Sequence, residues 1–162
     1  MFDGILKTGV AGSAAMALLA AGLGGAGPAQ AGECPADRVV ANREQPMETQ
    51  GRGVTDTVLA TIQLSQEPAA IKGRQLRLRR LVVAPDGVVP WHSHGNRPAL
   101  IYIVEGEITE YASTCSVPIV HRAGEAAIER NPTAHWWRNT SDRPAVLLSA
   151  DLFPTSEDAH VM

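Results

Sequence analysis

Two histidines separated by a single residue, His92 and His94, are the first candidates for chemistry in this sequence. They lie in the segment Trp91-His92-Ser93-His94, which follows a turn at Pro85-Asp86-Gly87 and has the character of a β-strand. Side chains two positions apart on a strand point to the same face, so both imidazoles can meet one ion. The spacing alone does not establish a metal site, because such pairs also occur by chance on exposed strands.

A third imidazole, that of His135, stands at the head of a later strand-like segment. Three neutral imidazoles can form a facial set of metal ligands that leaves other positions open. Alternation along that strand places Trp137 on the same face as His135, where its ring could form a wall of a substrate pocket. Trp91 and Trp136 then face away from the ligands, towards a core between sheets or a dimer surface.

The remaining histidines offer weaker signals. His121 ends a strand-like segment just before Gly124, where we expect an exposed or capped side chain, with a role beside the metal ligands as the alternative. His160 lies in a polar C-terminal stretch and is expected to be solvated. Surface positions are also expected for the glutamates near the Gly106 turn, Glu105, Glu107 and Glu110.

Short β-rich segments separated by Gly, Pro, Asp and Asn must position these side chains. We expect strands over 58–64, 74–83, 100–104, 108–112, 117–121, 126–129, 136–139 and 145–151. Leu76 and Leu78 alternate with Arg77 and Arg79, whose guanidinium groups we expect in solvent, and the phase slips near Arg80, which predicts a bulge or bend. No helical period is sustained, so the sequence predicts an all-β barrel or double-sheet jelly roll.

The N-terminal segment has the order of a secretory signal peptide. Residues 1–31 contain Lys7, an apolar run, a Gly/Pro stretch and the cleavage-site pattern Ala29-Gln30-Ala31. Cleavage after Ala31 predicts a periplasmic or secreted protein. The expected organisation continues with an extended arm over 32–53, a barrel over 54–153 and a loose tail over 154–162. In an oxidising compartment Cys34 and Cys115 could pair and tie the arm to the barrel, with two free thiols as the alternative.

Composition limits the classes of partner. The 162 residues include 14 Lys+Arg and 17 Asp+Glu, for a net charge of -3, and 44% are hydrophobic. These values fit one globular domain. Without a basic cluster, nucleic acid and anionic membranes are not expected as partners, which leaves a small molecule.

Two longer patterns resemble the conserved motifs of the cupin superfamily. The segment from Gly87 through His92 and His94 to Gly106 is similar to the first motif, G-x5-H-x-H followed by a strand and a Gly turn, although Gly87 lies one residue closer to His92. The segment Gly124–Asn139 is similar to the second motif, with His135 and the closing H-x3-N intact. The resemblance implies a double-stranded β-helix (jelly-roll) barrel holding one metal ion, usually through three His and one Glu.

The sequence departs from the first motif where the family has its glutamate, because Pro98 and Ala99 occupy that region. Carrying the ligands over gives His92, His94 and His135 and no carboxylate. Such a site would leave a divalent ion its full charge and favour an anionic substrate. The resemblance to oxygenases of this type favours Fe(II), with Zn, Mn, Ni or Cu as alternatives.

Two hypotheses of function follow. The first is a mononuclear metal-dependent dioxygenase acting on a small anionic or aromatic molecule, in which Arg97 or Tyr102 orients the substrate beside Trp137. A solvated Arg97 is the alternative, and either Tyr102 or Ile103 should face inward. The second hypothesis is a cupin that binds a metal or small ligand without turnover. A metal-dependent isomerase or lyase would need a base that the pattern does not supply.

The likeness to cupins also implies a homodimer formed through strand edges and the arm.

Overall fold

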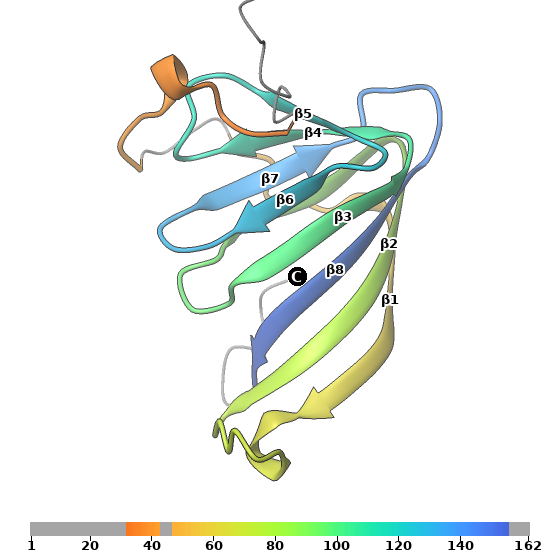
Figure 1. Ribbon diagram of the computed structural model, residues 1–162. Helices are drawn as coiled ribbons and strands as arrows, with labels where there is room; N and C mark the ends of the chain where they lie inside the picture. Colours follow the sequence, from red (N-terminus) through yellow and green to blue (C-terminus); the bar gives the residue numbers. More distant parts are fainter. Residues whose placement is uncertain (1–31, 43–46, 156–162) are drawn as a thin grey trace, which may run out of the picture.

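A computed structural model describes residues 32–42 and 47–155, which form a nearly closed antiparallel β-barrel (Figure 1). In these ranges helix is limited to two single turns, η1 (Ala36–Arg38) and η2 (Leu64–Gln66). No described helix is long and apolar enough to cross a membrane. The predicted signal peptide and most of the predicted tail lie outside the described residues. The strands are β1 (Arg52–Gln63), β2 (Arg74–Ser93), β3 (Ala99–Glu105), β4 (Glu107–Ala112), β5 (Ile119–Arg122), β6 (Ala126–Glu129), β7 (Ala134–Arg138) and β8 (Ala145–Pro154).

The long strand β2 belongs to both sheets of the jelly roll. Its first half pairs with β1 and β8, and its second half pairs with β7. One sheet therefore has the order β1-β2-β8-β3-β6 and the other has the order β2-β7-β4-β5. The strand bends at the predicted turn, where Asp86 has a φ of 59° and a Cβ on Gly87 would lie 2.7 Å from the Ala84 carbonyl oxygen. The bend carries the H-x-H segment from one sheet to the other.

The all-β prediction is confirmed, with shifts at strand ends. The predicted strand over 126–129 coincides with β6, and the predicted turn at Gly106, which has a φ of 77°, joins β3 to β4. β1 starts earlier than predicted, at Arg52, because its polar first half pairs with β2 as far as Val88, the partner of Arg52. The barrel therefore begins within the stretch that was expected to be an arm.

The expectation that the alternating arginines of β2 lie in solvent is wrong for Arg77 and Arg79. Arg79 is buried and Arg77 half-buried, whereas Leu76 and Leu78 are exposed. The odd-numbered side chains keep facing inward through Leu81, and the pairing of β2 with β8 has no register shift. Within β2 the phase slip marks a change from charged to apolar residues on one continuous inner face. The irregularity predicted near Arg80 lies in the partner strand, because the β1–β2 register shifts between Val58 and Ala60. The inner apolar cluster consists of Leu81, Val83, Ile101, Ile103, Ile108, Ala127, Trp137, Ala145 and Leu147.

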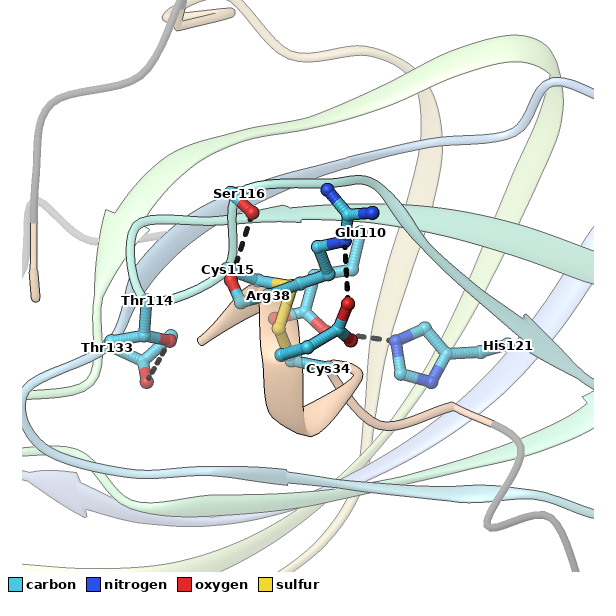
Figure 2. The surroundings of a disulfide bond; sticks show 9 residues. Cys34, Arg38, Glu110, Thr114, Cys115, Ser116, His121 and Thr133 are labelled. Atoms are coloured by element: carbon cyan, nitrogen blue, oxygen red, sulfur yellow. Dashed lines mark hydrogen bonds and ion pairs between the residues drawn. A yellow bond between two sulfur atoms is a disulfide. The ribbon is translucent and has the colours of Figure 1, made fainter. Parts of the chain in front are cut away.

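The segment before β1 is tied to the barrel by a disulfide between Cys34 and Cys115, 81 residues apart (Figure 2). Val39 forms a β-bridge with Cys115, and the carbonyl oxygen of Arg38 accepts hydrogen bonds from the backbone and hydroxyl of Ser116. Of the two alternatives for the cysteines, the structure has the disulfide. The first part of the predicted extended arm is thus a fixed part of the barrel wall.

Candidate metal centre

The three predicted histidines converge inside the barrel. His92 on β2 and His135 on β7 are direct cross-strand partners, and His94 lies one residue beyond the end of β2. The three ring centroids are 4.7–4.9 Å apart, and the Nε2 atoms of His92 and His135 are 3.2 Å apart. His94 is 1% exposed and His135 is fully buried. The structure therefore brings together the three histidines that the H-x-H spacing and the second motif single out.

A carboxylate joins the histidines, which the sequence did not predict. Glu129 stands at the end of β6 and is buried. Its Oε1 lies 3.2 Å from His135 Nε2, and its Oε2 lies 3.1 Å from His94 Nε2. One candidate ligand atom from each of His92, His94, Glu129 and His135 falls within 4.8 Å of the others. The expectation of a site without an acidic side chain is wrong.

Hydrogen bonds on the far side of each ring fix which nitrogen faces the centre. Nδ1 of His92 lies 2.8 Å from the carbonyl oxygen of Pro90, and Nδ1 of His94 lies 2.7 Å from that of Arg97. A carbonyl oxygen only accepts, so each Nδ1 carries the hydrogen and each Nε2 presents a lone pair. Nδ1 of His135 contacts Oε1 of Glu110 at 2.5 Å and is oriented in the same way. Outer partners of this kind hold imidazoles in position for a metal.

The inward-facing atoms repel one another unless a cation lies between them. The Nε2 atom of His94 is buried and makes no hydrogen bond, although the Glu129 carboxylate lies close by. Burial and the nearby His135 lower the pKa of His92 to about 3. Burial also acts to lower the pKa of His135, but the carboxylates of Glu129 and Glu110 outweigh it and raise this pKa to about 9. Without a metal a proton on His135 supplies the missing positive charge. Three nitrogens and one carboxylate are a suitable donor set for Zn, Fe, Mn, Ni or Cu.

Glu110 and His121 form a second buried pair, which Figure 2 shows and which contacts His135 through Glu110. His121 Nε2 is 2.9 Å from Glu110 Oε2, while the other oxygen of Glu110 contacts His135. Burial acts to raise the pKa of Glu110, but hydrogen bonds from His121 and His135 lower it to about 2. The expectation of surface positions for Glu110 and His121 is wrong, whereas the alternative of a role beside the metal ligands fits His121. The strand alternation of β4 was the available signal, since Ile108 and Glu110 share the buried face.

A cavity of about 410 Å³ is lined by two residues of the cluster, His92 and Glu129. Trp137 lines it on the face of His135, as alternation predicted, and its ring stacks on His121 at 4.6 Å between centroids. Arg97 is buried and lines the cavity, so it is not the solvated loop residue that was the alternative. Of the two residues considered on β3, Ile103 faces inward and Tyr102 is 48% exposed on the outer surface. Tyr102 is therefore not placed to orient a substrate in this cavity.

Comparison with known proteins identifies the family. The model of the cupin domain family matches residues 79–151, the part of the chain that holds all four clustered residues. Residues 79–151 form a cupin domain. No curated protein matches the chain.

Three solved structures share the cupin fold with the chain at a TM-score of 0.50. The Schizosaccharomyces pombe Cnp3 cupin domain is 10% identical, over 68% of this chain and 70% of that one. A Klebsiella pneumoniae protein with a double-stranded β-helix domain is 15% identical, over 70% and 84%. A predicted oxalate decarboxylase from Thermotoga maritima is 16% identical, over 70% and 99%. At these identities the likeness concerns the fold alone.

In this cupin a neighbouring strand supplies the carboxylate that the first motif lacks. Ala99, in the region where the motif has its glutamate, is the direct cross-strand partner of Glu129. Directly opposed residues on antiparallel strands point to the same face with Cβ atoms about 5 Å apart. A glutamate on β6 can therefore reach the place that a glutamate on β3 would have occupied. The register between β3 and β6, which no motif spacing encodes, determines this exchange.

Further charged side chains lie beside the cluster, and of these Asp56, Arg79 and Arg97 line the cavity. Arg77 makes two hydrogen bonds to Asp151, at 3.0 and 2.7 Å, and Arg79 pairs with Asp56. Asp151 also lies 3.7 Å from Arg79 and 3.6 Å from Arg97. Burial, together with the charge of Arg79, lowers the pKa of Arg97. This cluster holds three guanidinium groups against the two aspartates, which leaves it positively charged.

Proposed function

We propose that this cupin is an exported enzyme that binds one divalent metal ion and catalyses an oxygenase-type reaction on a small anionic molecule. The observation that carries the proposal is the convergence of His92, His94, Glu129 and His135, of which His92 and Glu129 line a cavity of about 410 Å³. That volume suits a small molecule rather than a polymer. Fe(II) is the favoured ion, with Zn, Mn, Ni or Cu as alternatives. A divalent ion held there would supply Lewis acidity and, if redox-active, electrons for reaction with dioxygen.

The charges around the cavity favour an anionic substrate. The guanidinium groups of Arg79 and Arg97 line the same cavity as Glu129. A bound divalent ion would add two positive charges to this buried surface, which would attract an anion. Arg97 can then hold a substrate carboxylate by charge-assisted hydrogen bonds. Trp137 provides an apolar wall that excludes water and can stack on a flat group.

The chain's own residues also keep the metal ligands ready. Glu110 bridges His135 and His121, so the ring of His135 cannot turn without breaking a buried hydrogen bond. The carbonyl oxygens of Pro90 and Arg97 hold the rings of His92 and His94 in the same manner. This prior positioning lowers the cost of ordering the ligands when a metal or a substrate binds.

Export is part of the proposal. The pattern ending in Ala29-Gln30-Ala31 supports cleavage there. The disulfide between Cys34 and Cys115 supports an oxidising compartment. N-terminal sequencing of the protein recovered from periplasm or medium tests it, with Gly32 expected as the first residue. A protein retained in the cytoplasm with Met1 would contradict export without affecting the metal site.

Metal analysis followed by an oxygen-uptake assay tests the enzymatic proposal. We expect about one iron per chain after anaerobic purification, and uptake of oxygen on adding a member of a panel of diketones, flavonols, thiols and carboxylates. His135→Ala is the control and should show neither. Stoichiometric zinc or copper with no turnover would favour the alternative of a cupin that binds a metal or ligand without catalysis. No bound metal in any preparation would contradict the enzymatic proposal and, of the alternative, would leave only the binding of a small ligand without a metal.

A further inference from the structure

The segment before the disulfide lies against a buried histidine. Figure 2 shows the chain before Cys34 running past His121. A Cβ placed on Gly32 in this segment would lie 2.6 Å from His121 Nδ1 and 3.3 Å from Glu125 Oε2. Gly32 is also the residue that follows the predicted cleavage site, so cleavage would make it the first residue of the exported chain.

His121 has a buried nitrogen that makes no hydrogen bond to any described residue. Its side chain is fully buried, and its Nε2 contacts the Glu110 carboxylate at 2.9 Å. The pKa of Glu110 is about 2, so this carboxylate is ionised and only accepts. Nε2 of His121 therefore carries the hydrogen, and Nδ1 of the neutral ring presents a lone pair. Burial of an acceptor without a donor is costly, so this place favours a hydrogen-bond donor.

Cleavage after Ala31 would supply a donor at this place. The Gly32 nitrogen would change from an amide with one N–H to a positively charged ammonium with three. Rotation of the freed end by about 120° about the Cα–C bond would bring this nitrogen to the position of the Cβ considered above, because both bonds to Cα are about 1.5 Å long. That position is within hydrogen-bond reach of His121 Nδ1 and within ion-pair distance of Glu125.

The Glu125 carboxylate is suited to an ammonium group. Glu125 is half-buried, and its Oε2 accepts a hydrogen bond at 2.8 Å from the backbone N–H of Arg122. This bond holds the carboxylate beside His121. A carboxylate oxygen can accept a second hydrogen bond, so an ammonium can share it.

We propose that the amino group formed at Gly32 by signal-peptide cleavage docks between Glu125 and His121 and is a positioning group for the metal centre. The inference rests on the export part of the proposed function and is independent of the oxygenase chemistry. His135 contacts Glu110, and Glu110 contacts His121. The amino group adds the outermost contact of this line, which fixes the ring of His121 and through it the carboxylate that orients His135.

The disulfide between Cys34 and Cys115 holds the new end of the chain at this place. Only two residues separate Gly32 from Cys34, so little conformational entropy is lost when the amino group docks. A chain that keeps its signal peptide has an amide at Gly32 and cannot form the ion pair. The metal centre therefore gains its last supporting contact during export.

Competitive acylation of amino groups tests the docking. The chain from Gly32 onwards has two amino groups, its N-terminus and the exposed Lys72. An accessible α-amino group has a pKa near 8 and reacts ahead of a lysine with a pKa near 10.4. After N-terminal sequencing, the exported protein is treated with a trace of acetic anhydride near neutral pH and analysed by mass spectrometry. We expect the ratio of Gly32 to Lys72 labelling to be at least about tenfold lower than in the same protein reduced and unfolded in urea.

A pair of charge variants tests the partner of the amino group. Glu125→Gln should raise the labelling ratio of the folded protein at least about threefold, because the ammonium loses its counter-charge. Glu105→Gln is the matched control, since it removes the same charge from an exposed residue before the Gly106 turn. It should leave the ratio unchanged. Equal increases in the two variants would overturn the pairing with Glu125.

A one-residue extension tests the positioning role. A serine inserted between Ala31 and Gly32 keeps the cleavage-site pattern and moves the amino group away from His121. The new amino group should be labelled as readily as in urea, and the ¹⁵N NMR signal of His121 Nδ1 should shift. Binding of Mn²⁺ should weaken by about threefold to tenfold, which is less than the loss for a group that touches a metal ligand directly.

The outcomes separate this inference from the proposed function. A chain that starts at Gly32 but whose amino group is labelled as readily as in urea would overturn the docking and leave export intact. A chain that starts elsewhere would overturn both the docking and export. A protected amino group, with the same Mn²⁺ affinity and the same His121 signal in the serine variant, would overturn the positioning role. Oxygen uptake enters none of these measurements, so the enzymatic proposal succeeds or fails separately.

Discussion

In the sheet β1-β2-β8-β3-β6 the usual distribution of side chains is reversed. Charged side chains lie on part of its inner face, and apolar side chains lie on its outer face. On the inner face, Arg77, Asp151 and Glu129 lie in a single cross-strand row that also contains Ala99. On the outer face the neighbouring row runs through Leu78, Leu100 and Ile128. A charged interior is favourable only where charges are paired or hold an ion. An apolar exterior is favourable only where another surface covers it.

The difference shows that alternation and orientation are separate pieces of information. The sequence of β2 alternates clearly, yet the arginines face the cavity and the leucines face outward. A period of two says which side chains share a face, and the neighbouring strands decide which face is enclosed. Here the enclosed face is the one that meets the metal ligands of β6, β7 and β2.

The largest effect is expected from the ligand that connects the two buried clusters. His135→Ala should abolish stoichiometric metal binding, because His135 faces both Glu129 and Glu110. Metal content per chain after dialysis against a metal buffer is the measurement. The control is the exposed Arg130→Ala, which should retain the metal of the natural chain. Equal metal content in the His135 variant would show that the cluster is not the site.

Much of this centre could be predicted from the sequence, and its two carboxylates were missed for different reasons. His92 and His94 were identified by their spacing, and His135 by the second motif. Glu129 was missed although its strand was predicted, because only the pairing of β6 with β3 brings it to the histidines. This contact joins distant segments and depends on sheet register. Glu110 was assigned to the surface because it follows a turn closely, although the alternation of β4 was a local signal for the buried face.

The buried charge row is the second place to test the inner face. Asp151→Asn should reduce the free energy of unfolding by about 3–5 kcal/mol, because it leaves Arg77 buried without its carboxylate. Urea unfolding of the metal-free protein is the measurement. Asp86→Asn is the matched control, since Asp86 is largely exposed and its pair with Arg138 should contribute less than about 1 kcal/mol. Equal losses in the two variants would mean that the inner row is solvated.

A glutamate placed on β3 should be able to replace the glutamate of β6 as a metal ligand. Glu129→Ala should weaken metal binding by at least about 10–100-fold, the loss known for residues that only support metal ligands. Adding Ala99→Glu to that variant should recover most of the affinity, because the two positions are paired on one face. Competition with a chromogenic chelator measures both constants. A double variant no better than Glu129→Ala would contradict the idea that β3 and β6 can supply the same ligand.

A smaller effect concerns the proton that His135 carries when no metal ion is bound. With a pKa of about 9, His135 carries a proton at neutral pH, while His92, with a pKa of about 3, does not. A metal must displace that proton, so the affinity should rise about tenfold per pH unit between pH 6 and 8. Titration calorimetry with Mn²⁺ in buffers of different ionisation enthalpy should show release of about one proton. A pH-independent affinity would mean that His135 is already neutral in the metal-free protein.

The smallest effect is expected on the outer face. Leu76→Thr should change the free energy of unfolding of the monomer by less than about 1 kcal/mol, because Leu76 is 38% exposed and threonine is well suited to a strand. Chemical unfolding at low protein concentration measures this value. The neighbouring inward change Arg77→Thr, one residue away on the same strand, should cost several times more, since Asp151 would lose its bidentate partner. If the two substitutions reduce the free energy of unfolding equally, inward-facing and outward-facing residues of β2 do not differ in their contribution to stability. A large cost for Leu76→Thr alone would instead mean that the outer face is already covered within a single chain.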